Sequence, residues 1–426
     1  MKFSLSKLFR VRTSKKMVPP QDPKPKVNLI IDTDIFSDVD DAGALLLAAT
    51  SPHANLLGVL VNKPSTYSVL CASAIVSYYT SSQSKEPIPI GVYRHRCPDG
   101  TTSPLLDRTF LDVVYWHLGE FCSKIAYQYG CDKTQTGTFI NPSIPWGEAE
   151  KAYDSVKLYR KLLAEAEDDS VTIVSIGFLD NLSLLIDSTG AEGSSNLSGK
   201  ELISKKVKEI IIMGGRYPPL QAPPSSSQPS SPTVGRTGIR SWNFFGSGPN
   251  LPHHNGGNGQ GLGVKGAMNF INQLPTLRKD YQWKGRVVYV GEEVGRDILT
   301  GAELVAEGPK GDPVGKAYRY YAYGEGRASW DPVAVLYAIY GLGEAGKEEW
   351  FKWNEDYRKG RNWVEKDGSN TWHDDKETTN QYVLAFRKGK DSETMVAKEI
   401  EKLFLEGARN AAREKVVSNR EVGAKG

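Results

Sequence analysis

Five aspartates crowd a ten-residue stretch near the start of the chain, IIDTDIFSDVDDAGALLLA: Asp32, Asp34, Asp38, Asp40 and Asp41. An apolar run precedes them, and an apolar, helix-like run at 42–49 follows them. A solvated acidic loop seldom lies between two such runs, and crowded carboxylates repel one another. Because carboxylate oxygens are ligands of hard cations, the stretch predicts a Ca²⁺ or Mg²⁺ site. An EF-hand loop is excluded, because the stretch lacks the Gly at the sixth loop position and the Glu at the twelfth that an EF-hand requires.

Short apolar runs recur along the chain and predict buried parallel strands. They are VNLII at 27–31, LLGVLV at 56–61, IPIGV at 88–92, VTIVSI at 171–176, EIIIM at 209–213 and RVVYV at 286–290. Amphipathic stretches lie between them, for example at 67–80, 148–165 and 333–340. This alternation is typical of an α/β fold with an open, mostly parallel sheet flanked by helices. Ligands bind such sheets beyond the carboxyl ends of the strands, where the aspartates fall.

Composition indicates a globular protein of 426 residues, because 39% of them are hydrophobic and 10% aromatic, which excludes collagen-like, coiled-coil and wholly disordered classes. We expect a single domain over residues 27–408. Residues 216–262 hold eight Pro, seven Ser and eight Gly, which predicts a flexible, disordered insertion. His253 and His254 within it could bind a metal, but a solvated loop explains them better. Residues 409–426 are predicted to be a charged C-terminal tail.

Charge is distributed unevenly, since residues 1–26 carry eight Lys and Arg against the single Asp22. The other 400 residues hold 45 basic and 49 acidic groups, which argues against a nucleic-acid-binding surface. The basic tail is a disordered extension, a weak mitochondrial presequence or an interaction arm. No run approaches the roughly 18 apolar residues of a membrane helix, and four cysteines without CxxC spacing indicate a reducing compartment. We therefore expect a cytoplasmic protein with no membrane partner, or a mitochondrial one if the basic N-terminus is a presequence.

The aspartate-rich stretch resembles the N-terminal signature of the nucleoside hydrolase (inosine-uridine nucleoside N-ribohydrolase) family, in which a strand ends in DxD and the next helix begins with DDA. Four later segments resemble family segments in the family's order: VTIVSIGFLDNLSLLI, EIIIMGG, SWNFFG and SWDPVAVLYAIYG. The match spans about residues 27–345. The Pro/Ser-rich insertion and the segments GEEVGRDILTG and SWDP are most similar to fungal members.

The resemblance implies an enzyme that hydrolyses the N-glycosidic bond of ribonucleosides at a bound Ca²⁺ ion and releases ribose and the free base. By resemblance, the metal ligands are Asp34, Asp41, Asp331 and the backbone carbonyl of Ile176, and Asp34 is also the general base. The expected partner is a small-molecule nucleoside, and family members often form a homo-oligomer. The residues that would contact the nucleoside are Asp40, Asn62, Met213, Asn243 and Trp330.

Three departures from the family pattern bear on this chemistry. The linker IFSDV is longer than the family's Pro-Gly form, so Asp38 competes for the metal or ribose role. Ser241 stands where the family has the Glu that recognises the ribose 5′-hydroxyl. Trp330 stands where many broad or pyrimidine-active members have His, which would be apt as an acid near neutral pH. Trp at this position resembles purine-preferring members, which stack the base between aromatic rings.

Two other functions stay open at this point. The start IIDTD also fits a haloacid-dehalogenase-type phosphatase, with Asp32 as nucleophile and Asp34 as acid, although no equally good set of later Ser/Thr, Lys and acidic residues accompanies it. A non-catalytic binding protein that keeps the fold is the second alternative. Ser241 and the missing His favour it, whereas the retained metal carboxylates argue against it.

Overall fold

A nine-stranded sheet forms the centre of the computed structural model, which describes residues 25–36, 38–80, 86–99, 101–105, 120–131, 142–219, 240–245, 263–343, 349–377 and 380–423. The strand order is β10-β13-β7-β6-β5-β1-β2-β3-β4. Neighbouring strands are parallel except for the β10 and β13 pair. The predicted open, mostly parallel α/β sheet is therefore confirmed.

The strands of this sheet are β1 (Val27–Thr33), β2 (Ala54–Val61), β3 (Ile90–Val92), β4 (Tyr153–Asp154), β5 (Val171–Ser175), β6 (Val207–Met213), β7 (Arg286–Val290), β10 (Phe351–Trp353) and β13 (Gln381–Phe386). Two small antiparallel pairs add β8 (Leu299–Thr300) with β9 (Arg327–Ala328), and β11 (Arg361–Val364) with β12 (Asn370–His373). All six strands predicted from apolar runs are present. They form because each run can be buried against helices on both faces of the sheet.

The longer helices are α1 (Asp40–Thr50), α2 (Thr66–Thr80), α4 (Ser155–Glu165), α5 (Asp180–Asp187), α6 (Gly199–Lys206), α8 (Val264–Lys279), α11 (Pro313–Ala322), α12 (Trp330–Tyr340) and α13 (Lys390–Gly423). Shorter ones are α7 (Trp242–Phe245), α9 (Glu292–Gly295), α10 (Ala302–Glu307) and the 3₁₀ turns η1 (Ala149–Lys151), η2 (Gly190–Glu192) and η3 (Glu355–Tyr357). Residues 120–130 are also helical.

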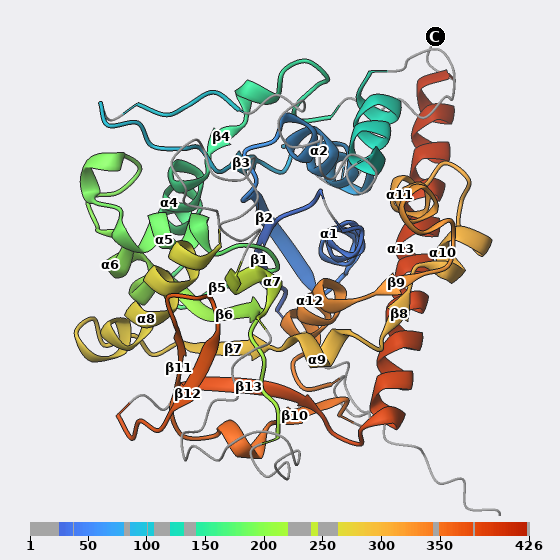
Figure 1. Ribbon diagram of the computed structural model, residues 1–426. Helices are drawn as coiled ribbons and strands as arrows, with labels where there is room; N and C mark the ends of the chain where they lie inside the picture. The colour runs from blue at the N-terminus through green and yellow to red at the C-terminus, as the bar shows by residue number, and fades with distance from the viewer. Residues whose placement is uncertain are drawn as a thin grey trace, which may run out of the picture.

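Helices cover the sheet on both faces, and each face has its own hydrophobic core. One layer holds α4, α5, α6 and α8, and the other holds α1, α2, α12 and α13 (Figure 1). Alternate residues of β1 point to opposite cores, with Ile30 in the first and Ile31 in the second. On the second face, α1 lies so close to its neighbours that a Cβ on Gly43 would meet the Phe404 ring of α13 at 2.6 Å.

The order of strands reverses between β1 and β5. From β1 the chain proceeds through β2 and β3 to β4 at one edge, then returns to β5 on the other side of β1. Loops that leave β1 and β5 at their carboxyl ends therefore diverge to opposite sides, and ligands of open α/β sheets bind at such a point. The five aspartates and Ile176 leave the sheet at this point.

Parts of the predicted insertion and tails can be compared with the structure. Residues 240–245 of the predicted insertion form α7 and its N-terminal flank, with Ser241 and Asn243 buried, whereas 220–239 and 246–262, including His253 and His254, lie outside the described residues. The predicted boundary at 408 falls inside α13, where Ala411 is buried. The helix continues there because small residues face the body. Residues 1–24 of the basic tail lie outside the described residues, so the predictions about that tail remain predictions.

None of the helices that the structure describes is both long enough and apolar enough to cross a membrane.

Candidate active site

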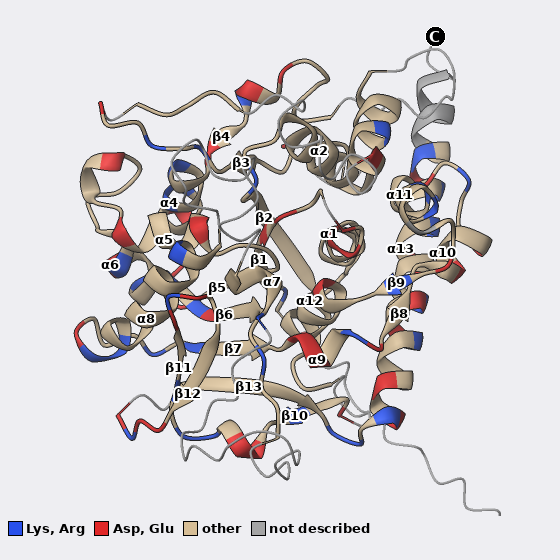
Figure 2. Ribbon diagram, in the orientation of Figure 1, with Lys and Arg blue, Asp and Glu red and all other residues tan. Residues whose placement is uncertain are grey.

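Three carboxylates from two distant segments meet near the carboxyl end of β1. Asp40 and Asp41 open α1, and Asp331 lies in the first turn of α12. One oxygen from each lies within 4.8 Å of the other two, and their side chains are at most 4% exposed. The Asp331 backbone N–H donates to Asp40 Oδ2 at 3.2 Å, which joins the two helix starts directly. Figure 2 shows the acidic residues at the starts of α1 and α12 on the otherwise sparsely charged interior.

The electrostatics of this carboxylate triad, Asp40, Asp41 and Asp331, are unfavourable without a cation. Burial is the largest cause that raises the pKa of each of the three, and repulsion from neighbouring aspartates raises it further. Several features oppose this, among them the positive end of the α1 dipole, the Thr33 hydroxyl, which donates to Asp41 Oδ1 at 2.5 Å, and the Arg327 charge, which lowers the pKa of Asp40. Arg327 is itself paired with another carboxylate, Asp38, so its charge does not balance the three carboxylates, and the triad has the character of a cation site.

Asp34 lies next to the triad but is held by other groups. Its Oδ2 is 3.6 Å from the Nζ of Lys63, a buried lysine that follows β2. Burial raises the pKa of Asp34, while the Lys63 charge and a hydrogen bond from the Trp242 side chain lower it. The Lys63 ammonium also lies 5.6 Å from the Phe36 ring centre and 5.7 Å from that of Phe178. Asp34 is therefore oriented by a cation rather than grouped with the three other carboxylates.

Ile176, Met213 and Asn243, three residues to which the resemblance assigned roles, lie in contact with one another. The Asn243 Nδ2 donates to the Ile176 carbonyl at 3.3 Å and to the Met213 carbonyl at 3.0 Å. It also lies 3.1 Å from the Met213 sulfur. The Asn243 amide thus joins the carboxyl ends of β5 and β6. It also orients the Ile176 carbonyl, for which the resemblance implies the role of a metal ligand.

Asn62 and Asp32 take part in a network of their own. The Asn62 Nδ2 donates to Asp32 Oδ1 at 3.0 Å and to the Phe178 carbonyl at 2.9 Å. Asp32 also accepts from Tyr159 and Asn181, from α4 and α5. Asp32 is fully buried among these donors, and burial raises its pKa to about 7. This placement does not fit a phosphatase nucleophile, which must face its substrate.

The Asp38 carboxylate pairs with Arg327, on β9. Arg327 Nε donates to Asp38 Oδ1 at 2.9 Å and Nη2 donates to Oδ2 at 2.5 Å, a bidentate pair. The charge of Asp38 also raises the pKa of Asp34 and of the three triad carboxyls, and the metal or ribose role that the longer linker left open for Asp38 stays a prediction.

Glu292, the first residue of α9, contacts both Trp330 and Trp242, the residue that follows Ser241. The Trp330 Nε1 donates to the Glu292 carbonyl at 2.7 Å. The Glu292 carboxylate accepts from the backbone N–H of Trp242 at 2.8 Å and pairs with Arg216. The Ser241 hydroxyl is buried and has no hydrogen-bond partner among the described residues. A carboxylate thus lies beside the position where the family has Glu, but it comes from another element.

The residues present fit a divalent cation. Three buried carboxylates converge, and the only cation of the described residues among the main causes of their pKa shifts is Arg327, which is itself paired with Asp38. The Ile176 carbonyl keeps a second lone pair beyond its long hydrogen bond. All of these donors are oxygens, which suits Ca²⁺ or Mg²⁺ rather than a soft metal. The assignment of Asp34, Asp41, Asp331 and Ile176 as the ligand set stays a prediction.

Sequence reasoning missed three residues that shape the site: Lys63, Arg327 and Thr33. The position of Thr33 could have been predicted, because it lies between Asp32 and Asp34. Side chains alternate along a strand, so the Thr33 hydroxyl must lie on the face of the strand opposite to Asp32 and Asp34. Lys63 and Arg327 carry no local signal, since each meets its aspartate only through contacts between distant segments.

Comparisons with known proteins agree with this geometry. The model of the inosine-uridine preferring nucleoside hydrolase family matches residues 29–245, just over half of the chain. Among solved structures, an inosine-guanosine nucleoside hydrolase is 18% identical, with a TM-score of 0.52 over 89% of this chain and 98% of that one. A plant nucleoside hydrolase is 15% identical, with a TM-score of 0.51 over 89% and 99%.

A purine-preferring ribonucleoside hydrolase from Gardnerella vaginalis is 13% identical, with a TM-score of 0.51 over 88% of this chain and 99% of its own. At these identities the likeness establishes the fold alone. No protein of curated function matches the chain.

Proposed function

The chain belongs to the inosine-uridine preferring nucleoside hydrolase family, and from that premise we propose that it hydrolyses the N-glycosidic bond of ribonucleosides with the help of Ca²⁺, purine nucleosides being preferred. The products would be ribose and the free base. The Pro/Ser-rich insertion and the GEEVGRDILTG segment support a place among fungal-type members of the family.

The observation that carries this proposal is the convergence of Asp40, Asp41 and Asp331 beside Asp34 at the point where the strand order reverses. Burying like charges together destabilises a fold. Such a group is therefore expected where a bound ligand of opposite charge offsets the repulsion. A nucleoside diol bound at a divalent cation would do so. A non-catalytic binding protein would need the cation and the diol contacts, but it would not need a separate, oriented base such as Asp34.

The proposed mechanism assigns a task to each residue. Asp41 and Asp331 would hold the cation, with the Ile176 carbonyl, and Asp40 would bind ribose hydroxyls. When bound, the cation would supply Lewis acidity that favours deprotonation of a water. Asp34 would accept the proton from the attacking water, with its carboxylate kept in place by Lys63. The remaining negative charge around the site would stabilise the cationic sugar of the transition state.

Preference for purines follows from the leaving-base side of the site. Trp330 offers an indole rather than a proton donor suited to neutral pH, so departure of the base must rely on stacking and on protonation from solvent. A purine has the larger stacking face and an N7 that can accept a proton. The partly buried Trp330 ring, fixed through its Nε1, supports this role.

The test is release of ribose from a panel of inosine, adenosine, guanosine, uridine and cytidine, with Ca²⁺ and with excess chelator. We expect purine nucleosides to be cleaved, and turnover to stop on chelation and return with Ca²⁺. Binding of nucleosides without any ribose release would instead establish the non-catalytic alternative. A release rate that chelator does not change would contradict the role of the metal.

The roles of Asp34 and Asp40 can be separated by calorimetric Ca²⁺ titration of Asp34→Asn and Asp40→Asn. If Asp34 is a ligand as well as the base, Asp34→Asn should weaken Ca²⁺ binding and abolish turnover. If Asp40 is the third ligand instead, as its place in the triad suggests, Asp40→Asn should weaken Ca²⁺ binding more than Asp34→Asn does. Ribose binding alone for Asp40 predicts a raised KM with unchanged Ca²⁺ affinity.

A further inference from the structure

The ion pair between Asp38 and Arg327 connects the two segments that carry the site. Asp38 lies in the loop between Asp34 and Asp40, and Arg327 lies four residues before Asp331. The bidentate geometry, with Nε to Oδ1 at 2.9 Å and Nη2 to Oδ2 at 2.5 Å, fixes the plane of the guanidinium. Neither side chain is fully buried, with exposed fractions of 24% and 35%.

Arg327 also lies near two aromatic rings, those of Trp330 and Tyr321. The centre of its guanidinium lies 5.3 Å from the Trp330 ring centre and 5.7 Å from the Tyr321 ring centre. Both distances are within the range of cation–π attraction. Because the plane of the guanidinium is set by Asp38, the position of the cation over the indole is set by Asp38 as well.

The Trp330 indole is held from other directions too. Its Nε1 donates to the Glu292 carbonyl, and its backbone packs against Gly295, where a Cβ would come within 2.3 Å of the Trp330 Cα. The Ser329 N–H donates to the Gly295 carbonyl at 3.2 Å. The backbone and the indole edge are thus fixed by α9, and Arg327 is the described cation that sits against the ring.

We propose that Asp38 and Arg327 are positioning residues that fix the Trp330 ring and thereby set which leaving base the site accepts. The inference rests on the proposed hydrolysis and on the place of Trp330 beside the leaving base. With Arg327 against the ring, rotation of the indole is restricted, so a flat base would stack on a ring that is already in position. A purine relies more on stacking than a pyrimidine does, so the restriction should raise kcat/KM more for purine nucleosides.

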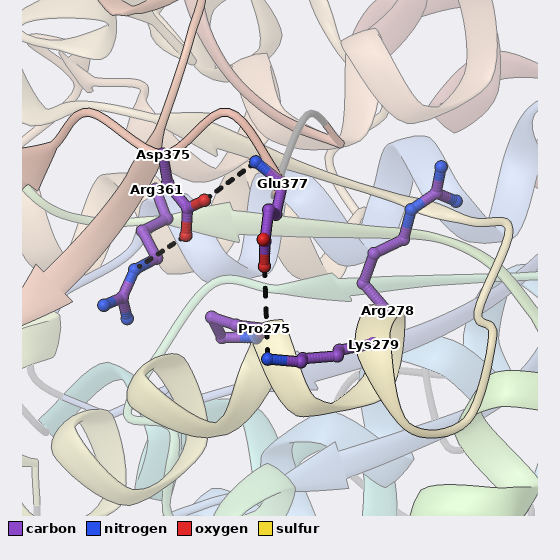
Figure 3. A pocket seen from close by; sticks show the side chains of 6 residues that line it. All are labelled: Pro275, Arg278, Lys279, Arg361, Asp375 and Glu377. Carbon is purple, nitrogen blue, oxygen red and sulfur yellow. Dashed lines mark hydrogen bonds and ion pairs between the residues drawn. The ribbon is translucent and has the colours of Figure 1, made fainter.

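The chain contains a matched pair far from the site. Arg361 pairs with Asp375 at 3.2 Å, with exposed fractions of 27% and 25%, and its guanidinium lies 5.0 Å from the Trp363 ring centre. Figure 3 shows this pair beside the shallow surface pocket formed by α8 and the residues after β12. The same chemistry occurs there, and the group of carboxylates found among the described residues as a possible metal site lies elsewhere, at Asp40, Asp41 and Asp331, so Arg361 serves as the control for Arg327.

The experiment is a double-mutant cycle with Arg327→Met and Trp330→Ala, read as kcat/KM for inosine and for uridine in Ca²⁺. Losing the cation should lower kcat/KM for inosine by roughly five- to twentyfold and lower the inosine to uridine ratio. In the Trp330→Ala background, Arg327→Met should have little further effect, because its target is gone. Arg361→Met should leave the ratio unchanged.

Two further variants guard against a purely structural explanation. Arg327→Lys keeps the charge but loses the bidentate fork, so it should restore part of the ratio. Asp38→Asn should lower the ratio in the same direction as Arg327→Met, and it tests the idea even if Arg327→Met fails to fold. Equal losses on both nucleosides, or effects that simply add in the cycle, would overturn the positioning role while leaving the proposed function intact. A well-folded parent protein that releases no ribose would overturn the proposed function, and this inference with it.

Discussion

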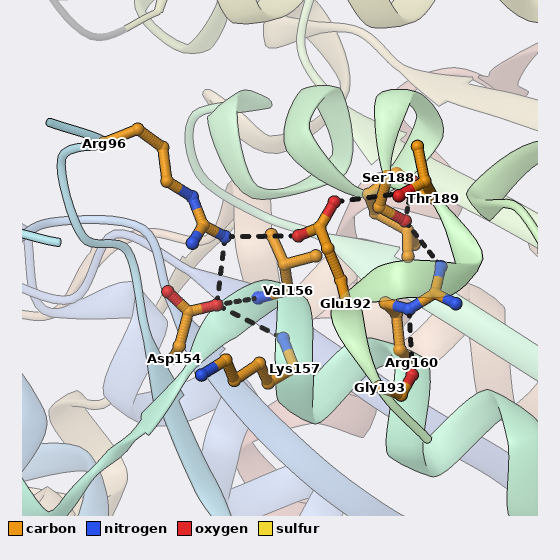
Figure 4. A network of polar contacts seen from close by, with 10 residues as sticks. Arg96, Asp154, Val156, Lys157, Arg160, Ser188, Thr189, Glu192 and Gly193 are labelled. Carbon is orange, nitrogen blue, oxygen red and sulfur yellow. Dashed lines mark hydrogen bonds and ion pairs between the residues drawn. The ribbon is translucent and has the colours of Figure 1, made fainter. Parts of the chain in front are cut away.

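Arg160 and the carboxylate triad both place charge in the interior, on opposite sides of the same sheet. Arg160, on α4, donates to Ser188 Oγ at 2.8 Å and to the Gly193 carbonyl at 3.2 Å (Figure 4). It also donates to the carbonyls of Ser195 and Leu197. Its charge is dispersed over four neutral acceptors. The triad has the opposite character, because its closest polar neighbours include other carboxylates.

The difference separates a structural charge from a functional one. Arg160 orders the irregular segment around η2 by capturing its carbonyls, so its hydrogen bonds are complete within the fold. The triad is incomplete within the described part of the fold, and completing it requires something the chain does not provide. The following expectations test this contrast.

Asp331→Ala should give the largest effect on function. Removing one of three cation ligands should abolish Ca²⁺ binding in calorimetry and lower ribose release by roughly a thousandfold or more. In chelator, the melting temperature should hold or rise, because one of the mutually repelling charges is gone. A large fall in that melting temperature would show that the triad stabilises the fold by itself.

Arg160→Met should show the reverse pattern. It removes four hydrogen bonds donated by the guanidinium, one of them to the buried Ser188 hydroxyl, so urea denaturation should show a loss of about 3 kcal/mol or more in the free energy of unfolding. The kcat/KM of the folded variant should stay close to that of the parent. Lost turnover in a variant that is still folded would mean that the two regions are coupled.

Trp330→Ala should have an intermediate effect. Stacking of a base on an aromatic ring is worth about 1 to 3 kcal/mol in nucleic-acid sites, so kcat/KM on purine nucleosides should fall roughly ten- to a hundredfold. Ca²⁺ affinity should be unchanged, since the indole offers no ligand oxygen. Intact purine turnover in Trp330→Ala, or uridine cleaved by the parent as fast as inosine, would rule out the stacking role.

The smallest expected effect concerns pH and Asp180. Burial raises the pKa of this carboxyl to about 7, whereas the unfolded chain has its ordinary value near 4. The folded state therefore binds the proton more tightly, and this contribution to stability is present below pH 4 and lost as pH rises through 7. In chelator, the parent should melt at a higher temperature at pH 6 than at pH 8. Asp180→Asn should reduce that difference, and an unchanged pH dependence would show that Asp180 does not titrate in this range.

Local sequence was sufficient for six of the nine strands of the sheet but not for β4, β10 and β13, nor for the whole site. Apolar runs such as EIIIM indicate strands that are buried on both faces, because such strands are continuously apolar. The crowding of the aspartates around the start of α1 predicted a cation site, and Asp40 and Asp41 do lie in a buried triad of carboxylates. The meeting of Asp38 with Arg327, nearly 290 residues apart in sequence, depends on how β9 is placed relative to β1. No local pattern encodes such a placement.

The close fit of Gly43 against Phe404 has a consequence for how the protein is made. The start of α1 holds Asp40 and Asp41, yet part of the surface of α1 is covered by α13, which comes late in the sequence. During synthesis on a ribosome, most of the polypeptide must emerge before α13 can cover this part of α1. Until then, the apolar surface of α1 stays exposed. We expect a chain stopped at residue 389 to be more readily cleaved by protease near α1 than the full chain, and to bind no Ca²⁺. We therefore expect the site to form only after α13 has been synthesised, although the aspartate-rich stretch is made first.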